Sequence, residues 1–237
     1  MSKMDLYPSA ATPPIGRVLQ SAWDTTRLCE SLASLRSIVI ILNIGLTEVL
    51  LTNDRKEREE ELQQYEKRLR RCLDEMCDIK DEFFVTEFRD LTEGMHRATI
   101  TSTLGEINQE RMEHEDLWRE FLGLYVACLS FAAKIAGHKK KYDEASQLLA
   151  FIIDACVYSG AYLNLDDRSR ADGRSVTISR FRARLASALF GQCKYYHAKM
   201  FARSALVDLS LGCCGQDPDV LSCLSIVTFL DKRRTRK

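Results

Sequence analysis

Proline and glycine are scarce in this chain. Its 237 residues include four prolines and eleven glycines, and between residues 17 and 90 the only residue of either type is Gly45. Both residues disfavour the interior of a helix, so their scarcity predicts long helices. The length suffices for one sizeable helical domain, alone or with a helical arm. We therefore expect an all-α fold.

The chain also lacks an excess of charge of either sign. Lys and Arg together number 34, as do Asp and Glu, so there is no overall attraction to nucleic acid or to an anionic membrane. The apolar stretch 38–51 is interrupted by Asn43, Gly45 and Glu48. It is also shorter than the roughly 20 residues of a membrane span. This stretch predicts a buried helix and no membrane partner.

A secretory signal and a disulfide framework are missing as well. The first residues, Met1 to Asp5, do not show a basic segment followed by an apolar one. The nine cysteines are odd in number and scattered, which favours reduced thiols over disulfides. We expect a cytoplasmic protein. Most of the cysteines fall in apolar stripes and are expected in the core: Cys29, Cys72, Cys128, Cys156, Cys193 and Cys223.

No pattern of catalytic or metal-binding residues is present. There is no Gly-rich phosphate loop, no His-Glu-x-x-His and no Gly-x-Ser-x-Gly. The adjacent pair Cys213-Cys214 does not supply two Cys-x-x-Cys knuckles for zinc. We therefore expect a non-enzymatic protein without catalytic residues, cofactor or metal. The histidines lie far apart in polar surroundings and are expected on the surface: His96, His114, His138 and His197.

The amino-terminal part divides into a tail and a long helix. Residues 1–16 contain Pro8, Pro13, Pro14 and Gly16 and predict a flexible tail. Helical periodicity then runs from residue 17 to about residue 51, and residues 35–51 are apolar on more than one face. This pattern predicts a central helix. It is followed by cap-type side chains for a new helix at Thr52-Asn53-Asp54.

Residues 55–83 are rich in charge and carry a heptad pattern. The intervals between the apolar residues alternate between three and four, which is typical of a coiled-coil seam. One interpretation is an intermolecular coiled coil that makes a homodimer. The favoured interpretation is a long amphipathic helix that folds onto its own domain. The seam consists of Leu62, Tyr65, Leu69, Cys72, Met76, Ile79 and Phe83.

Residues 84–116 show the least regular pattern. Gly94 and Gly105 interrupt them, and residues 106–116 are charged with little apolar content. We expect an irregular connection there, either without regular structure or with one short polar helix. Helical periodicity returns at Leu117 and predicts a helical stack over residues 117–232, followed by a basic tail, 233–237.

Two segments of this stack share a pattern. Lys141-Tyr142 and Ala145 match Lys194-Tyr195 and Ala198 at an offset of 53 residues (194 − 141). A tyrosine at the turn would pack across two helices, and an alanine three residues later would let their backbones approach. Two helical hairpins with an equivalent turn are expected.

The second hairpin resembles a tetratricopeptide repeat, in particular the longer kind found in kinesin light chains. The resemblance covers about residues 120–232. Leu185, Ala186 and Leu189 occupy the core positions of the first helix of a repeat. Cys193 stands where the turn of the family usually has glycine, and Asp217-Pro218-Asp219-Val220 resembles the exit loop. The corresponding positions of the second helix hold Tyr195, Ala198, Ala202 and Ala205.

The first hairpin departs from that pattern. Ala132, Ala133 and Ala136 replace larger residues, and Ile152 replaces a small one. The residues after Val220 could cap the stack. Length and helix order also resemble a divergent 14-3-3 protein. The Arg-Tyr pair and basic residues of that family's phosphate pocket are replaced here by Leu129-Ser130-Phe131 and Ser37-Ile38-Val39.

The repeat resemblance implies a protein-protein interaction module or adaptor. In such stacks the first helix of each unit lines a concave groove that receives a peptide or helix of a partner. Arg180, Arg184 and Ser187 would face that groove, and the arginines would suit an acidic partner. Two alternatives remain: self-assembly through residues 55–83, and contact with nucleic acid, or nuclear import, through the basic tail.

Overall fold

The computed structural model describes residues 15–84, 109–158, 176–213 and 215–234, and these ranges contain helices and no strands. The all-α expectation is confirmed. The predictions made for residues 1–14, 85–108, 159–175 and 235–237 lie outside the described residues. The helices are α1 (Ile15–Leu51), α2 (Arg55–Phe83), α4 (Gln109–His138), α5 (Tyr142–Tyr158), α6 (Val176–Gly191), α7 (Tyr195–Gly212) and α8 (Pro218–Arg234).

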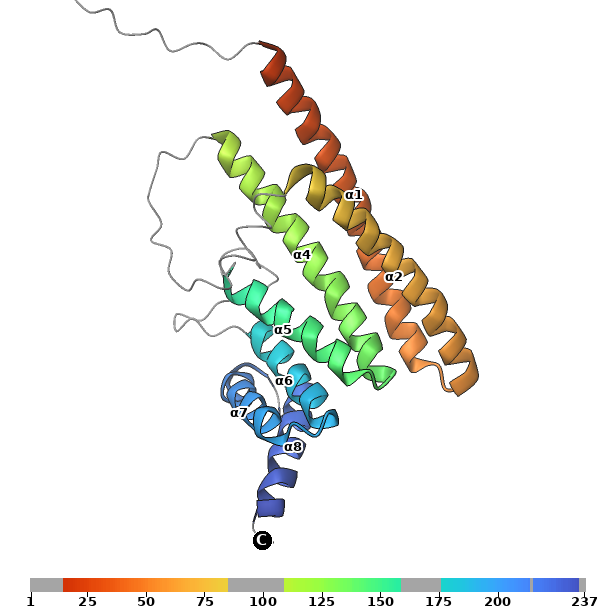
Figure 1. Ribbon diagram of the computed structural model, residues 1–237, viewed down its shortest axis with the longest axis vertical. Helices are drawn as coiled ribbons and strands as arrows, with labels where there is room; N and C mark the ends of the chain where they lie inside the picture. Colours follow the sequence, from red (N-terminus) through yellow and green to blue (C-terminus); the bar gives the residue numbers. More distant parts are fainter. Residues whose placement is uncertain (1–14, 85–108, 159–175, 214, 235–237) are drawn as a thin grey trace, which may run out of the picture.

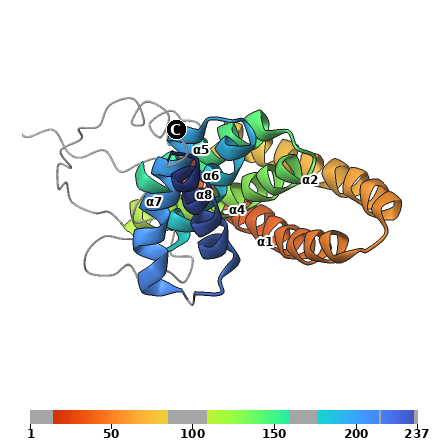
Figure 2. The same ribbon diagram turned by 90° about the horizontal axis from the view of Figure 1, so that it is seen from below.

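The helices form two connected parts (Figure 1). The long helices α1, α2 and α4 pack on one another as a bundle. From α4 onward, each helix packs against the next one in the chain, and α6 also contacts α8. Helix α4 therefore belongs to both the bundle and the stack of α5 to α8, and Figure 2 shows α1 and α2 on the side of α4 away from α7 and α8.

The boundary between α1 and α2 lies where the cap residues predicted it. The Asp54 carboxylate accepts hydrogen bonds from the backbone N–H groups of Lys56 (2.7 Å) and Glu57 (3.0 Å). These bonds satisfy donors that have no partner within the first turn. They also lower the pKa of Asp54, the bond from Glu57 most of all.

The heptad seam of α2 is buried within the chain. Leu62, Tyr65, Leu69, Cys72 and Met76 are all buried, and α2 packs against α1 and α4. The Tyr65 hydroxyl donates a hydrogen bond of 2.7 Å to the backbone oxygen of Leu42 in α1. An intermolecular coiled coil through this seam would have to displace one of those helices.

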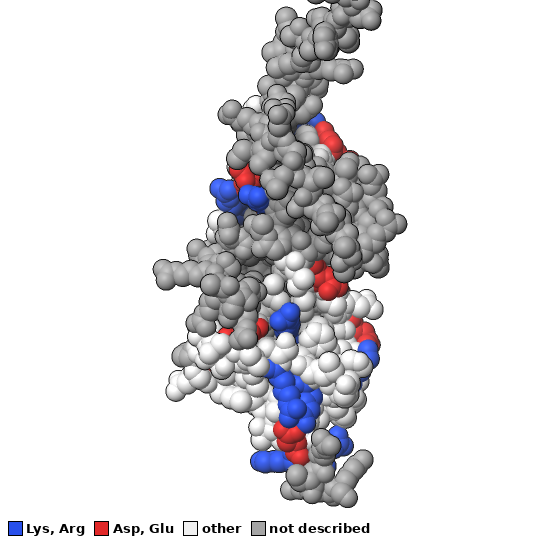
Figure 3. All heavy atoms as spheres, turned by 90° about the vertical axis from the view of Figure 1, so that its left-hand side faces the viewer, with Lys and Arg blue, Asp and Glu red and all other residues white. Residues whose placement is uncertain are grey.

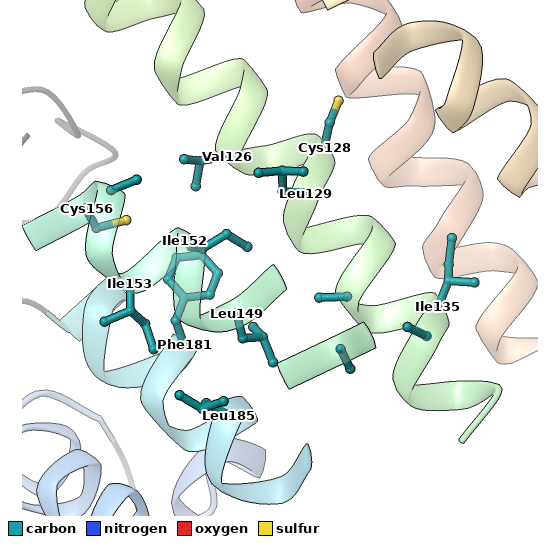
Figure 4. Close-up of a cluster of buried hydrophobic side chains, with 14 of the residues drawn as sticks. Val126, Cys128, Leu129, Ile135, Leu149, Ile152, Ile153, Cys156, Phe181 and Leu185 are labelled. Atoms are coloured by element: carbon teal, nitrogen blue, oxygen red, sulfur yellow. The ribbon is translucent and has the colours of Figure 1, made fainter. Parts of the chain in front are cut away.

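Helix α4, and not the carboxy-terminal half of α1, is the central helix. Figure 4 shows Cys128 and Ile135 pointing toward α1 and α2, while Val126 and Leu129 point toward α5 and α6. By contrast, α1 buries one stripe only and leaves isoleucines exposed on the opposite face, and the exposed fraction of Ile41 reaches 64%. The expectation of a central helix at residues 35–51 is wrong, because an apolar surface on several faces does not show that each face is covered.

Two of the helical segments are long and apolar enough to cross a membrane, Thr25–Leu51 and Asp116–His138. Length and composition alone are weak evidence, because a core helix of a soluble protein meets the same criteria. The second segment is the part of α4 that packs on both sides. The absence of a membrane partner stays a prediction.

Helix α4 begins earlier than the apolar pattern indicated. Its first residue is Gln109, whereas residues 84–116 were expected to be irregular. Its first turns, Gln109-Glu110-Arg111-Met112-Glu113, consist of residues with high helix propensity. These residues carry little apolar content, so apolar periodicity alone could not locate this start.

The two helical hairpins end their first helices with the same backbone geometry. Lys140 and Cys193 both adopt left-handed backbone conformations, with φ of 58° and 60°. The turn hydrogen bonds from Lys141 to Ala136 (2.8 Å) and from Lys194 to Leu189 (2.9 Å) also correspond. The offset of 53 residues thus relates two equivalent turns. It also explains why glycine would suit position 193, because φ near 60° favours residues without a Cβ atom.

Most of the predicted core thiols are buried, but two are not. Cys72, Cys128, Cys156 and Cys223 are buried, and the cysteines of the described residues are free. Cys29 and Cys193 are exposed, contrary to expectation. Cys193 occupies the left-handed turn position, which lies beyond the packed face of α6.

Gly191, at the end of α6, allows the turn of one hairpin to contact the other. A Cβ atom at this position would lie 2.8 Å from three atoms of the Tyr142 ring. The same contact is held by Gln192, whose side-chain nitrogen donates to the backbone oxygen of Tyr142 (2.6 Å) and to Ser146 Oγ (2.7 Å). Tyr142 thus packs on the following hairpin.

Replacing Gly191 with alanine is expected to destabilise the protein by about 1–3 kcal/mol, because the new methyl group forces the Tyr142 ring away. Gly123 in α4 is a matched control, since a Cβ atom there meets nothing within 4 Å. Gly123→Ala should be neutral or stabilise by about 0.5–1 kcal/mol through helix propensity. Urea unfolding of both variants measures the difference, and equal stabilities would contradict the proposed contact.

Candidate functional site

A cleft of about 440 Å³ lies between the two hairpins. This volume falls within the range of roughly 300–1,000 Å³ that is typical of ligand pockets. Helices α4 and α6, the first helices of the two hairpins, supply most of its walls, and Asp219 of α8 lies at one border. The cleft thus lies between the first helices of the two hairpins.

One face of α4 forms a wall of the cleft. Ser130, Ala133, Lys134, Gly137 and His138 line it, and their spacing of three and four residues places them on the same side of the helix. Alanine and glycine at this face leave space that larger side chains would fill. The opposite wall and the floor are formed by Tyr142, Ala145, Leu149, Arg184, Ser187 and Ala188.

The cleft carries a net positive charge, because Lys134 and Arg184 line it together with one carboxylate, that of Asp219. Partial burial lowers the pKa of Lys134, and the neighbouring Arg184 guanidinium lowers it further. Burial likewise lowers the pKa of His138, with contributions from Lys134 and Arg58. An anion between Lys134 and Arg184 would oppose these effects, because it favours the charged form of each base. The site is therefore suited to a carboxylate or another anionic group.

Arg180 lies outside the cleft and holds α8 in place. Its guanidinium pairs with Asp217 at 2.7 Å and with Asp219 at 3.2 Å. Asp217 also accepts a hydrogen bond of 2.9 Å from the backbone N–H of Asp219 in the first turn of α8. Burial by itself would raise the pKa of Asp217, but that hydrogen bond and Arg180 bring it below its usual range.

The three residues predicted to bind a partner therefore have different positions. Arg184 and Ser187 line the cleft, and Arg180 does not. Arg184 Nε lies 3.7 Å from Asp219 Oδ1, and Asp219 also pairs with Arg180. Ser187 Oγ lies 2.8 Å from Ser222 Oγ of α8. Residues of α8 thus contact all three side chains, and only Arg184 and Ser187 also line the cleft.

Sequence reasoning missed Lys134 and placed His138 among isolated surface histidines. The offset of 53 residues could have found the lysine, because it relates Ser187 to Lys134 (187 − 53). Both residues line the cleft, from α6 and α4 respectively. His138 is exposed at the end of α4, as expected, but it borders the cleft.

A second hollow of about 700 Å³ adjoins the first, and His138 borders both. It lies between the start of α2 and the turn from α4 to α5, and its charged lining residues are Arg55, Arg58, Glu59, Lys139 and Lys140. Lys139 forms an ion pair of 2.5 Å with Glu66. This hollow extends the basic surface beyond the cleft.

Basic side chains on α7 are paired with an acidic residue of α8. Figure 3 shows acidic and basic side chains next to each other near the carboxy-terminal end, on the side where α7 lies. Lys199 and Arg203 of α7 both pair with Asp231 of α8. Both bases of that face are therefore already paired with a carboxylate.

None of the protein-family models, curated proteins or solved structures compared with this chain matches it. Among the described residues, no group of three or more His, Cys, Asp or Glu side chains is placed to hold a metal ion.

Proposed function

We propose that the protein is a non-enzymatic interaction module that binds an acidic segment of another protein in the cleft between α4 and α6. The observation that carries this proposal is the position of Lys134 and Arg184 on opposite walls of a cleft with an apolar floor. Such a cleft can hold an apolar side chain and pair a neighbouring carboxylate with either base. The tetratricopeptide resemblance agrees with binding between first helices.

The test compares two short fluorescent peptides, one of alternating Glu and Leu and one in which Gln replaces every Glu. The acidic peptide is expected to bind at least about tenfold more tightly, because it alone supplies charge-assisted hydrogen bonds. The double variant Lys134→Ala, Arg184→Ala should lose this preference. Fluorescence anisotropy at two salt concentrations measures affinity and its electrostatic component.

Lys199→Ala with Arg203→Ala is the matched control. It removes the same charge from α7, where both bases already pair with Asp231. The control should bind the acidic peptide as the unmodified protein does. Equal losses in both double variants would show a nonspecific effect of net charge and would contradict a site in the cleft.

A further inference from the structure

The second hollow, between the start of α2 and the turn from α4 to α5, has an excess of positive charge. Four bases and one acid, Glu59, line it. Glu59 pairs with Arg55 at 3.1 Å, and Glu66, which lies beside the hollow, pairs with Lys139 at 2.5 Å. These two pairs offset two of the four bases. The charge of the other two is left for a ligand.

Those other two bases are Arg58 and Lys140. Neither forms an ion pair with any residue that the structure describes. Arg58 Nη1 donates to the backbone oxygen of Thr52 (3.3 Å), and Arg58 lowers the pKa of Asp54 from a distance, after the two backbone N–H groups that Asp54 caps. A guanidinium carries several N–H donors, so most of those of Arg58 remain open to a carboxylate.

His138 connects this hollow with the cleft. It lines both of them, at the carboxy-terminal end of α4. Burial lowers the pKa of His138, and so do Lys134 from the cleft and Arg58 from the hollow. Charges change the pKa of a group in this way only when they lie near it. The bases of the two sites therefore lie on either side of one imidazole.

The hollow adjoins one end of the cleft. The cleft follows α4 from Ser130 to His138, and the hollow continues with Lys139 and Lys140. Figure 1 shows the turn from α4 to α5 and the start of α2 at the same end of the bundle. Lys134 precedes His138 by one helical turn, or about 6 Å along the axis. An extended peptide advances about 3.3 Å per residue, so a few residues can reach from one basic site to the other.

We propose that the partner segment extends from the cleft into this hollow and places a second acidic group against Arg58 and Lys140. This inference rests on the proposed function. The ligand is then a segment with two parts: an apolar residue next to a carboxylate, which enters the cleft, and an acidic cluster a few residues away. A protein segment is favoured over nucleic acid because Ala145 and Leu149 give the adjoining cleft an apolar floor.

Two contacts on one segment give more affinity than either alone. An ion pair at an exposed site is weak by itself, because water screens it. Once the cleft holds the first part of the segment, the second contact forms within the complex and costs less entropy. We therefore expect the acidic cluster to strengthen binding only when it is joined to the cleft-binding part.

Fluorescence anisotropy with four peptides tests the proposal. Each peptide has a part of alternating Leu and Glu, a Gly-Ser-Gly spacer and a cluster of three Glu or three Gln, and the cluster stands at either the amino or the carboxyl end. The Glu cluster is expected to strengthen binding about tenfold over the Gln cluster at one end. It should do little at the other end, because the hollow adjoins one end of the cleft.

The double variant Arg58→Gln, Lys140→Gln should remove this gain and leave the affinity for the Gln-cluster peptide within about twofold. Lys67→Gln with Arg71→Gln is the matched control. It also replaces one lysine and one arginine, at exposed positions of α2 outside the hollow, and should keep the gain. Circular dichroism melts establish that both double variants are folded.

The outcomes separate this inference from the proposed function. If no peptide binds, the proposed function fails and the extension fails with it. If the peptides bind but the Glu cluster adds nothing, or if the gain survives in Arg58→Gln, Lys140→Gln, the extension alone is wrong. A single-stranded oligonucleotide that binds more tightly than any peptide, and is lost in that variant, would show instead that the hollow binds nucleic acid.

Discussion

Replacing Phe121 with alanine is expected to lower the free energy of unfolding by about 3–5 kcal/mol. The Phe121 ring is fully buried in α4. Its centroid lies 5.0 Å from that of Phe84, which follows α2, and 6.0 Å from those of Trp118 and Tyr125. Truncation removes these ring contacts and leaves a cavity that the surrounding helices can fill only in part.

The measurement is thermal unfolding by circular dichroism together with urea titration. For a chain of this size the melting temperature should fall by about 10 °C. Phe229→Ala is the control, because the Phe229 side chain is 49% exposed on α8. Its effect should be well below that of Phe121→Ala. A loss of less than about 1 kcal/mol for Phe121→Ala would contradict the tightly packed aromatic cluster.

Most helix boundaries could be predicted because they depend on local chemistry. Asp54 caps α2 with its own carboxylate, and Pro218 begins α8 because its fixed φ suits the first turn. The turns at Lys140 and Cys193 share a backbone geometry that the 53-residue offset already indicated. In each case the residues that determine the structure are neighbours in the sequence.

The neighbours of a helix face could not be predicted in this way. The apolar surface of residues 35–51 indicated a central helix, yet burial depends on which helices pack nearby, and α4, unlike α1, is covered on both sides. The same limit applies to Arg180. Its spacing from Arg184 indicated a shared groove, whereas Asp217 and Asp219, more than one helix away, draw it into an ion cluster.

The residues of the cleft could be predicted from the sequence only in part. Ser187 and Arg184 were identified from the repeat pattern, but Lys134 approaches them only because α4 and α6 both pack against α5. Sequence alone cannot tell which charges will remain open to a cleft and which will be neutralised by another helix. Lys134 and Arg184 lie on opposite walls of the cleft, so only the folded chain brings their charges close together.

Replacing Ala202 with leucine is expected to destabilise the stack by about 3 kcal/mol, near the upper end of the usual cost of overpacking. Helix α7 packs against α6 and α8, and its buried stripe includes Ala198, Ala202 and Ala205, each fully buried. Small residues on this stripe permit close approach of the helix backbones. A leucine at the middle position must therefore separate α7 from its neighbours or adopt a strained rotamer.

Ser204→Leu is the matched control, because Ser204 lies on the exposed face of the same helix. It introduces the same side chain two residues further along α7. Because this side chain points into solvent, it should change stability by less than about 0.5 kcal/mol. Urea unfolding measures both effects, and peptide affinity gives a second readout. Because α6 supplies Arg184, displacement of the α6–α7 pair should also weaken binding of the acidic peptide. If Ala202→Leu were as stable as Ser204→Leu, the α6–α7 contact would have to be looser than the buried alanines indicate.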